Sequence, residues 1–374
     1  MSRSGRSEGS TGDSGYPHKS AEEGRITSKK ERATPIFALF QIGSVSGQRQ
    51  FAPPFGAALG LESSRRDRAE GAIMSRYRGV VRGVLIALGF LSLRQLAWGQ
   101  DATPPKDVFG PDSLPQPGVP EGKVQEFHAP DSKAFPGFTH DWWLYTPAQY
   151  NPAKPAALMV FQDGADFMKR DGHWRLAVVL DNLIAHGQLP VIAAVFVNPG
   201  VSIGRGVDGK PMNNNRSVEY DTLSPAYATF LWNEILPEVR QHVQLREDPG
   251  ARAIGGCSSG GIAAFTTAWQ FPDRFRKVLS LSGTYTNIRG GNAYPGIVRS
   301  AAHKPIRVFQ QVGAHDAVRE GLGSWLEANQ SMSAALEEKH YDHKFVVTGD
   351  THCGVENAAQ VPDAMRWLWR DYPR

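Results

Sequence analysis

The segment Gly256-Cys-Ser258-Ser-Gly260 places a serine between two glycines at the spacing G-x-S-x-G. A serine on a sharp turn between a strand and a helix can act as a nucleophile, because its hydroxyl then projects out of the sheet. The flanks fit that setting, since we expect a short apolar strand at 252–254 and a helix of small residues at 260–269. Glycine is needed in so tight a turn because a Cβ would clash. The sequence therefore predicts Ser258 as a nucleophile.

A serine nucleophile needs a base and an acid, which follow it along the chain as acid and then histidine in α/β-hydrolases. Asp316 comes directly after a strand expected at 306–312, and His352 comes after one expected at 344–348. We predict that His352 takes the serine proton and that Asp316 accepts from the imidazole and orients it. The competing carboxylates are Glu320, Glu327 and Asp350.

Backbone N–H groups near the nucleophile can hold the oxyanion of an ester reaction. We predict the N–H of Ser259 as one donor, because it begins the helix after the nucleophile. The second is expected in the loop after the apolar run 156–161, where Gly164 permits close approach and Ala165 offers its N–H. An ordinary tight turn explains that loop equally well. Ser259 is also the competing nucleophile, but it lacks a glycine two residues before it.

The chain has only two cysteines, and both lie beside these candidate residues. Cys257 precedes the nucleophile, and Cys353 follows the base. In an exported protein an even pair favours a disulfide, so we expect one here; two buried free thiols are the alternative. No set of His, Cys and Asp shows a zinc spacing, and we predict neither a metal nor another cofactor.

The elements that must position these residues alternate between strand and helix, which predicts an α/β fold with a mostly parallel central sheet covered on both faces. Strands are expected at 124–128, 139–145, 156–161, 191–197, 252–254, 277–281, 306–312 and 344–348. Helices are expected at 174–185, from Ser224-Pro225 onward, and at 260–269, 323–340 and 357–369. We assign this domain to residues 124–374.

The N-terminal part of the chain predicts export. Residues 1–73 show neither helical nor strand periodicity, and we expect them to be disordered or an extension upstream of a true start at Met74. Residues 74–99 combine a basic start, a short apolar run and a small-x-small site ending at Gly99, as a signal peptide does. The Pro- and Gly-rich residues 100–123 are expected to be a linker.

Two bulk properties of the sequence indicate where the protein is located and which kinds of partner it binds. The apolar run of the signal peptide is shorter than the roughly 20 residues that span a bilayer, so we expect a periplasmic or secreted protein with no stable membrane anchor after cleavage. The net charge is +4, but residues 1–99 carry +7 and the remainder −3. The mildly acidic domain shows no basic stripe, which excludes nucleic acid as the expected partner.

With these residues in place, the chain resembles the putative esterase family, which includes enterochelin esterases, esterase D and bacterial feruloyl esterase domains. The resemblance covers residues 124–372. It implies an α/β-hydrolase acting on carboxylic esters of small molecules or glycans, with Ser258, Asp316 and His352 as its triad. It rests on the segments Phe161–Gly164, Arg216–Asp221, Glu234–Pro237, Gly255–Ile262, Phe271–Phe275 and Gly313–Asp316, and on His352.

Two positions depart from the family pattern. Relatives often carry a glycine directly before the histidine, where this chain has Thr351, and Cys353 is unusual there. Cysteines beside the serine and the histidine resemble the CS–D–HC signature of tannases and fungal feruloyl esterases, which are larger and carry a lid domain. Siderophore esters and plant phenolic esters therefore both remain candidate substrates.

Arg216 and Glu219 follow a polar, Gly-rich segment and have two interpretations. Arg216 could meet a carboxylate or catecholate oxygen of the substrate, or the two side chains could pair and brace the loop. Beyond an exported ester hydrolase, two other classes stay open: a non-catalytic hydrolase-fold binding protein, and an acyltransferase that uses the same acyl-enzyme.

Overall fold

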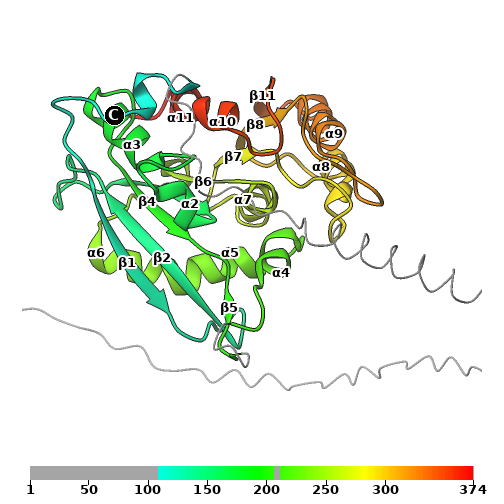
Figure 1. Cartoon of the computed structure of the whole chain (residues 1–374), viewed down its shortest axis with the longest axis horizontal. Coiled ribbons are helices and arrows are strands. Elements are labelled where there is room, and N and C mark those ends of the chain that lie inside the picture. Colours follow the sequence, from blue (N-terminus) through cyan, green and yellow to red (C-terminus); the bar gives the residue numbers. More distant parts are fainter. Residues whose placement is uncertain (1–107, 206–210, 374) are drawn as a thin grey trace, which may run out of the picture. The chain divides into compact units, whose positions relative to one another are not determined.

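The structure, a computed structural model, describes residues 108–205 and 211–373 and is built around a nine-stranded sheet (Figure 1). Its strands are β1 (Lys123–Ala129), β2 (Phe138–Thr146), β3 (Ala157–Gln162), β4 (Ile192–Val197), β5 (Val201–Ser202), β6 (Arg252–Cys257), β7 (Lys277–Leu281), β8 (Arg307–Gly313) and β11 (Asp342–Thr348). Their order is β1-β2-β4-β3-β6-β7-β8-β11, and β5 pairs with β2. The strands from β4 to β11 run parallel, whereas β2 is antiparallel to β1, β4 and β5.

Apolar composition explains the middle of the sheet. Every residue of β3, β4, β6 and β7 is buried, as expected of parallel strands covered on both faces. The terminal strands differ, because β1 is largely exposed and β11 alternates between exposed and half-buried residues. The predicted α/β architecture is confirmed. The predicted strand bounds agree to within two residues except at β6, which continues through two glycines to Cys257.

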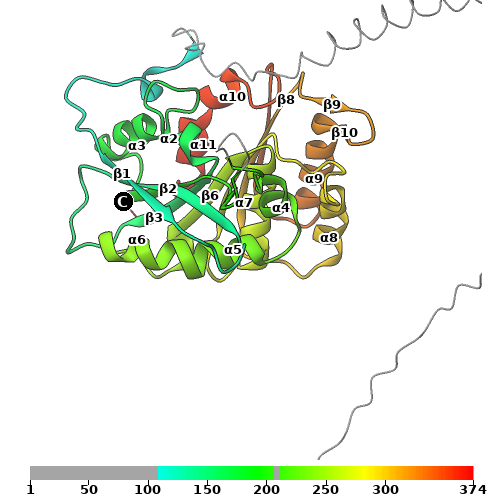
Figure 2. The same cartoon turned by 60° about the horizontal axis from the view of Figure 1, so that its bottom comes forward.

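Helices cover both faces of the sheet (Figure 2). One face carries α2 (Gly164–Met168), α3 (Leu176–Ala185), α10 (Val355–Ala359) and α11 (Val361–Leu368), which share one apolar core with the strands. The other carries α4 (Arg216–Asp221), α5 (Ala226–Phe230), the π-helical turn η3 (Leu231–Ile235), α6 (Leu236–His242), α7 (Ser259–Gln270), α8 (Tyr294–Ser300) and α9 (Trp325–Glu338). Short 3-10 turns lie at η2 (Pro111–Ser113), η4 (Pro249–Ala251) and η5 (Gly291–Ala293).

Two predicted helices have different bounds in the structure. The helix expected at 357–369 is divided into α10 and α11, because Pro362 stands in the first turn of α11 and cannot continue a preceding helix. The helix expected at 323–340 begins at Trp325. Gly323–Ser324 forms the short strand β10, which pairs with β9 (Val318–Arg319), and the Ser324 hydroxyl caps α9 by accepting from the Glu327 N–H.

The predicted linker is wrong for its second half. Phe109 is buried beneath the guanidinium of Arg175, whose central carbon lies 4.1 Å from the ring centroid. The amide of Asn182 on α3 donates to the carbonyl oxygens of Asp112 and Leu114 at 2.9 Å each. These contacts give residues 108–122 a fixed place against α3, so the packed domain begins before 124.

The predicted extension at 1–73 and the signal peptide at 74–99 lie outside the described residues. Within the described ranges, no helix is long and apolar enough to cross a membrane. The same part of the chain holds no group of three or more His, Cys, Asp or Glu side chains suited to a metal ion.

Candidate active site

The turn that carries Ser258 joins β6 to α7. Ser258 has φ 60° and ψ −123°, a backbone conformation that residues other than glycine rarely adopt. Its N–H donates to the carbonyl oxygen of Leu281 at 2.9 Å, which ties the turn to the end of β7. A Cβ on Gly256 would lie 2.8 Å from the backbone of Gly260. The turn therefore has the sharpness that the sequence predicts, and glycine is required at 256 for that reason.

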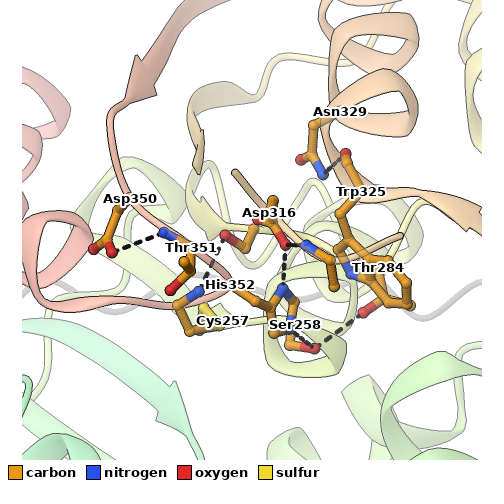
Figure 3. Close-up of polar contacts among 12 residues, drawn as sticks. Cys257, Ser258, Thr284, Asp316, Trp325, Asn329, Asp350, Thr351 and His352 are labelled. Carbon is orange, nitrogen blue, oxygen red and sulfur yellow. Dashed lines mark hydrogen bonds and ion pairs between the residues drawn. A yellow bond between two sulfur atoms is a disulfide. The ribbon is translucent and has the colours of Figure 1, made fainter. Parts of the chain in front are cut away.

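Three of the predicted site residues meet at the carboxyl ends of the parallel strands (Figure 3). Asp316 follows β8, and His352 follows β11. Nδ1 of His352 lies 2.5 Å from Oδ1 of Asp316, and Nε2 lies 2.9 Å from Oγ of Ser258. The structure thus brings Ser258, His352 and Asp316 into one hydrogen-bonded chain.

The protonation of Asp316 decides which way this chain of hydrogen bonds runs. Its side chain is fully buried, and burial alone raises the pKa of a carboxyl group. Hydrogen bonds to the carboxylate, among them those from His352 and from the Ala317 N–H at 2.6 Å, outweigh burial and hold the pKa of Asp316 below its usual value. The ionised carboxylate accepts the Nδ1–H of His352, so Nε2 presents its lone pair to the Ser258 hydroxyl.

Two residues outside the hydrogen-bonded chain of Ser258, His352 and Asp316 hold the loop that carries His352. Asp350 accepts from the Glu356 N–H at 2.7 Å and so ties the loop to α10. His173 donates from Nε2 to the carbonyl oxygen of Cys353 at 2.8 Å, and burial lowers the pKa of His173. The sequence analysis considered Asp350 only as a competing acid and did not single out His173. A contact between residues 180 positions apart leaves no local pattern to find.

A disulfide joins Cys257 to Cys353, with 6.2 Å between the Cα atoms (Figure 3). That separation lies in the usual range of about 4.4–6.8 Å for a disulfide. Because one cysteine precedes Ser258 and the other follows His352, the bond connects the nucleophile turn directly to the histidine loop.

Replacing both cysteines by alanine is expected to destabilise the fold strongly. The bond spans 96 residues, and closing a loop of this length stabilises a protein by about 4 kcal/mol through the denatured chain. For a domain of this size we expect the unfolding midpoint to fall by about 8–16 °C. Thermal unfolding followed by circular dichroism measures it, with the reduced parent protein as a control. A midpoint shift below about 3 °C would contradict the expectation.

In the structure, the two backbone N–H groups that were predicted to bind an oxyanion have different surroundings. Ser259 is the first residue of α7, so its N–H lies at the helix N-terminus beside Ser258. The N–H of Ala165 instead donates to Oδ1 of Asn198 at 2.9 Å and is not open to a substrate oxygen, so the prediction for Ala165 does not hold. Gly164 is also needed for a different reason, because a Cβ there would lie 2.3 Å from the backbone of Phe196 on β4.

Arg216 and Glu219 do not form the pair that was one of the two interpretations of these residues. Nε and Nη2 of Arg216 donate to the two carboxylate oxygens of Asp163 at 2.7 and 2.8 Å. Glu219 is buried and accepts from Nε2 of His140 at 3.1 Å and from the amide of Asn215 at 2.9 Å. They therefore do not pair with each other. Arg216 instead braces the turn after β3, where Asp163 has a left-handed φ of 56°.

Changing Arg216 to glutamine is expected to lower the free energy of unfolding by about 1.5–3 kcal/mol, as for other hydrogen bonds to a charged group. The change leaves the half-buried Asp163 carboxylate without its bidentate partner. Urea unfolding measures the loss. Arg299→Gln is the matched control, because Arg299 pairs with Glu338 on the exposed surface and should show no measurable change. Equal losses in the two variants would contradict a bracing role for Arg216.

Two further side chains contact His352 and Ser258. The indole of Trp325 is buried and meets the imidazole of His352 edge to face, with ring centroids 5.4 Å apart. The hydroxyl oxygen of Thr284 lies 3.3 Å from Oγ of Ser258. The sequence analysis singled out neither, since each belongs to a segment whose pattern predicted only ordinary helix or loop.

The fold and the strand-end site define an α/β-hydrolase. A model of the family described as "Putative esterase" matches residues 140–363, which is more than half of the chain. The chain therefore belongs to the putative esterase family, and the resemblance found from its motifs is confirmed.

Curated relatives are distant. The iron(III) enterobactin esterase of Dickeya dadantii (strain 3937) is 25% identical over 244 residues, which cover 60% of this chain and 51% of that protein. This chain thus spans about half the length of that relative. An uncharacterized protein of Bacillus subtilis (strain 168), YbbA, is 20% identical over 237 residues, covering 60% of this chain and 91% of that protein.

Solved structures share the fold. The enterobactin esterase FES from Shigella flexneri, crystallised with 2,3-dihydroxy-N-benzoyl-glycine, has a TM-score of 0.53 at 19% identity, covering 69% of this chain and 62% of that one. The ferulic acid esterase AmCE1/Fae1A from Anaeromyces mucronatus has a TM-score of 0.56 at 18% identity, covering 69% of this chain and 96% of that one. At such identities these matches establish the α/β-hydrolase fold alone.

Proposed function

We propose that this protein is an exported serine esterase that hydrolyses carboxylic esters through an acyl-enzyme on Ser258. One observation carries the proposal: the hydrogen-bonded chain from Asp316 through His352 to Ser258, with distances of 2.5 and 2.9 Å. This is the arrangement that lets an imidazole remove a serine proton while a carboxylate stabilises the imidazolium. Membership of the putative esterase family supports the same class of reaction.

The proposed reaction has two steps. In the first, Oγ of Ser258 attacks the ester carbonyl carbon as its proton passes to Nε2 of His352, and His352 then protonates the departing alcohol. In the second, His352 takes a proton from water, the water oxygen attacks the acyl carbon, and Ser258 is released with its proton restored. The N–H of Ser259 and the N-terminal end of α7 lie where the carbonyl oxygen becomes negative, and a helix N-terminus favours such a charge.

For the substrate we propose an enterochelin-like ester, in which catechol-bearing groups are joined through ester bonds. The support is the family assignment and the 25% identity to an iron(III) enterobactin esterase. The second candidate class is a feruloyl or acetyl ester on plant polysaccharide, which the paired cysteines beside Ser258 and His352 favour.

Turnover of an ester panel by the full chain tests both parts of the proposal. p-Nitrophenyl butyrate reports ester hydrolysis of any kind, enterobactin reports the siderophore class, and methyl ferulate reports the phenolic class. We expect hydrolysis of the first two, together with stoichiometric labelling of Ser258 by a fluorophosphonate. Faster cleavage of methyl ferulate than of enterobactin would favour phenolic esters over enterochelin-like esters as the substrate class. A folded protein that neither labels nor turns over would favour a binding protein, and transfer of the acyl group to an added alcohol in preference to water would favour an acyltransferase.

Export is a separate part of the proposal and rests on the signal-peptide pattern of residues 74–99. The disulfide supports it, because such bonds persist in oxidising compartments outside the cytosol. We expect the mature protein in the periplasm or the medium to begin at Gln100. Mass spectrometry of the N-terminal peptide from each cell fraction tests this, and an uncleaved chain confined to the cytosol would contradict it.

A further inference from the structure

We infer that Thr284 is a further catalytic residue, whose hydroxyl donates a hydrogen bond to Oγ of Ser258 and holds it in the attacking position. The inference rests on the proposed serine esterase function. Oγ1 of Thr284 lies 3.3 Å from Oγ of Ser258, on the loop that follows β7 (Figure 3). The Thr284 side chain is fully buried, so water does not compete for its hydroxyl.

The direction of this hydrogen bond follows from counting protons. Asp316 is ionised and accepts the Nδ1–H of His352, so Nε2 of His352 is an acceptor. The single proton of the Ser258 hydroxyl therefore points to Nε2, at 2.9 Å. Oγ can therefore only accept a hydrogen bond from Thr284 through its lone pairs, so Thr284 must be the donor. Among the described residues its hydroxyl has no other hydrogen-bond partner.

The backbone around Thr284 is held so that this contact is built into the site. The Thr284 N–H donates to the carbonyl oxygen of Ser258 at 3.1 Å, and the Ser258 N–H donates to Leu281 at 2.9 Å. The amide of the buried Asn329, on α9, donates to the carbonyl oxygen of Gly283 at 2.8 Å. Three hydrogen bonds thus fix the 281–284 loop against the nucleophile turn, and the Thr284 side chain has a defined place beside Oγ.

The chemistry that Thr284 serves is the attack itself. As Oγ passes its proton to Nε2 and begins its bond to the carbonyl carbon, negative charge on Oγ is at its largest, and a donated hydrogen bond is then strongest. The contact weakens once Oγ is an ester oxygen. At 3.3 Å the bond is longer than the roughly 2.7–2.8 Å usual for two hydroxyls, and such contacts tighten when substrate binds. We therefore expect a moderate effect on the chemical step and little on substrate binding.

Three variants at position 284 and one control test this. Thr284→Val keeps the shape of the side chain and removes its hydroxyl, whereas Thr284→Ser keeps the hydroxyl. The Thr284→Ala and Thr284→Ser variants differ from each other by one oxygen atom. The control is Thr286→Val on the same loop. Thr286 is also buried, and its hydroxyl has no partner among the described residues. The full chain is assayed for kcat and KM on p-nitrophenyl butyrate and for the rate constant of fluorophosphonate labelling of Ser258.

We expect Thr284→Val to lower kcat and the labelling rate constant by about 5- to 30-fold, the effect of about 1–2 kcal/mol at 1.36 kcal/mol per factor of ten. KM should change less than about 2-fold, because ground-state binding is untouched. Thr284→Ser should stay within about 3-fold of the parent, and Thr286→Val should match it. If valine prevents folding, the serine and alanine variants should differ by the same 5- to 30-fold.

Two results would overturn the inference, and they can be told apart. An active parent whose Thr284→Val or Thr284→Ala variant matches it in kcat and labelling would remove the role of Thr284 and leave the esterase proposal intact. A parent that neither turns over nor labels would remove the esterase proposal, and the inference with it.

Discussion

Ser258→Ala is expected to lower kcat by about 10⁶-fold. The loss is this large because the proposed reaction runs through a covalent bond to Oγ of Ser258, and no alanine atom can form it. The hydroxyl lies 2.9 Å from the base proposed to activate it, Nε2 of His352. Without Oγ, His352 and Asp316 have no serine hydroxyl to activate, and no acyl-enzyme can form.

The fold should survive this change. The unusual backbone of Ser258 is imposed by the hydrogen bond to Leu281 and the disulfide at Cys257, and alanine keeps both. We expect the unfolding midpoint to stay within a few degrees of the parent. Ser300→Ala, an exposed serine at the end of α8, is the matched control and should retain full activity. Turnover above about one hundredth of the parent in a pure Ser258→Ala sample would exclude Ser258, and fluorophosphonate labelling would then show whether Ser259 is the nucleophile.

Asp316→Asn is expected to lower kcat by about 10⁴-fold with little change in KM. An asparagine amide that donates to Nδ1 would stabilise the imidazole tautomer whose proton is on Nε2, and that nitrogen could no longer accept from Ser258. The burial of Asp316 makes the effect severe, because water cannot take the place of its fully buried carboxylate. Steady-state kinetics on p-nitrophenyl butyrate measures the loss.

Asp363→Asn is the control for this change. Asp363 lies on the exposed side of α11, paired with Arg366, and should show parent activity. A variant at 316 that keeps more than about a tenth of the parent kcat would shift the acid role to another carboxylate. Asp350 is then the first to examine, because it lies in the histidine loop and accepts from the Glu356 N–H.

The lowered pKa of Asp316 also predicts how stability depends on pH. A carboxyl group whose pKa is lower in the folded protein contributes stability above the pKa it has in the unfolded chain. That contribution disappears as the pH falls through the lower, folded-state value. We expect the parent to lose unfolding free energy on acidification through this range, and Asp316→Asn to lose less. Urea unfolding at a series of acidic pH values measures this free energy for both proteins. If the free energy of unfolding fell equally in the parent and in Asp316→Asn, the ionised state assigned to Asp316 would be contradicted.

The sequence alone was enough to predict the class of fold and the place of the site. Short continuous apolar runs such as those of β3 and β4 are typical of buried parallel strands, and their alternation with helices leaves few arrangements. In a parallel sheet all carboxyl ends share one edge, so residues following β6, β8 and β11 were expected to meet there. The structure does bring together Ser258, Asp316 and His352. Their meeting could be predicted because both the local pattern and the order of the strands can be inferred from the sequence.

Only the tertiary structure decided the partners of the remaining polar groups. The Ala165 N–H is taken by Asn198, Arg216 binds Asp163, and the Thr284 hydroxyl reaches Ser258. Each contact joins residues that are distant along the chain, and each depends on differences of about an ångström in where two loops lie, since a hydrogen bond at 3.6 Å is no longer one. Periodicity and motif spacing determine which edge of the sheet a loop occupies, but not which atom it faces. The donors, acceptors and braces around the triad are therefore properties of the packed structure.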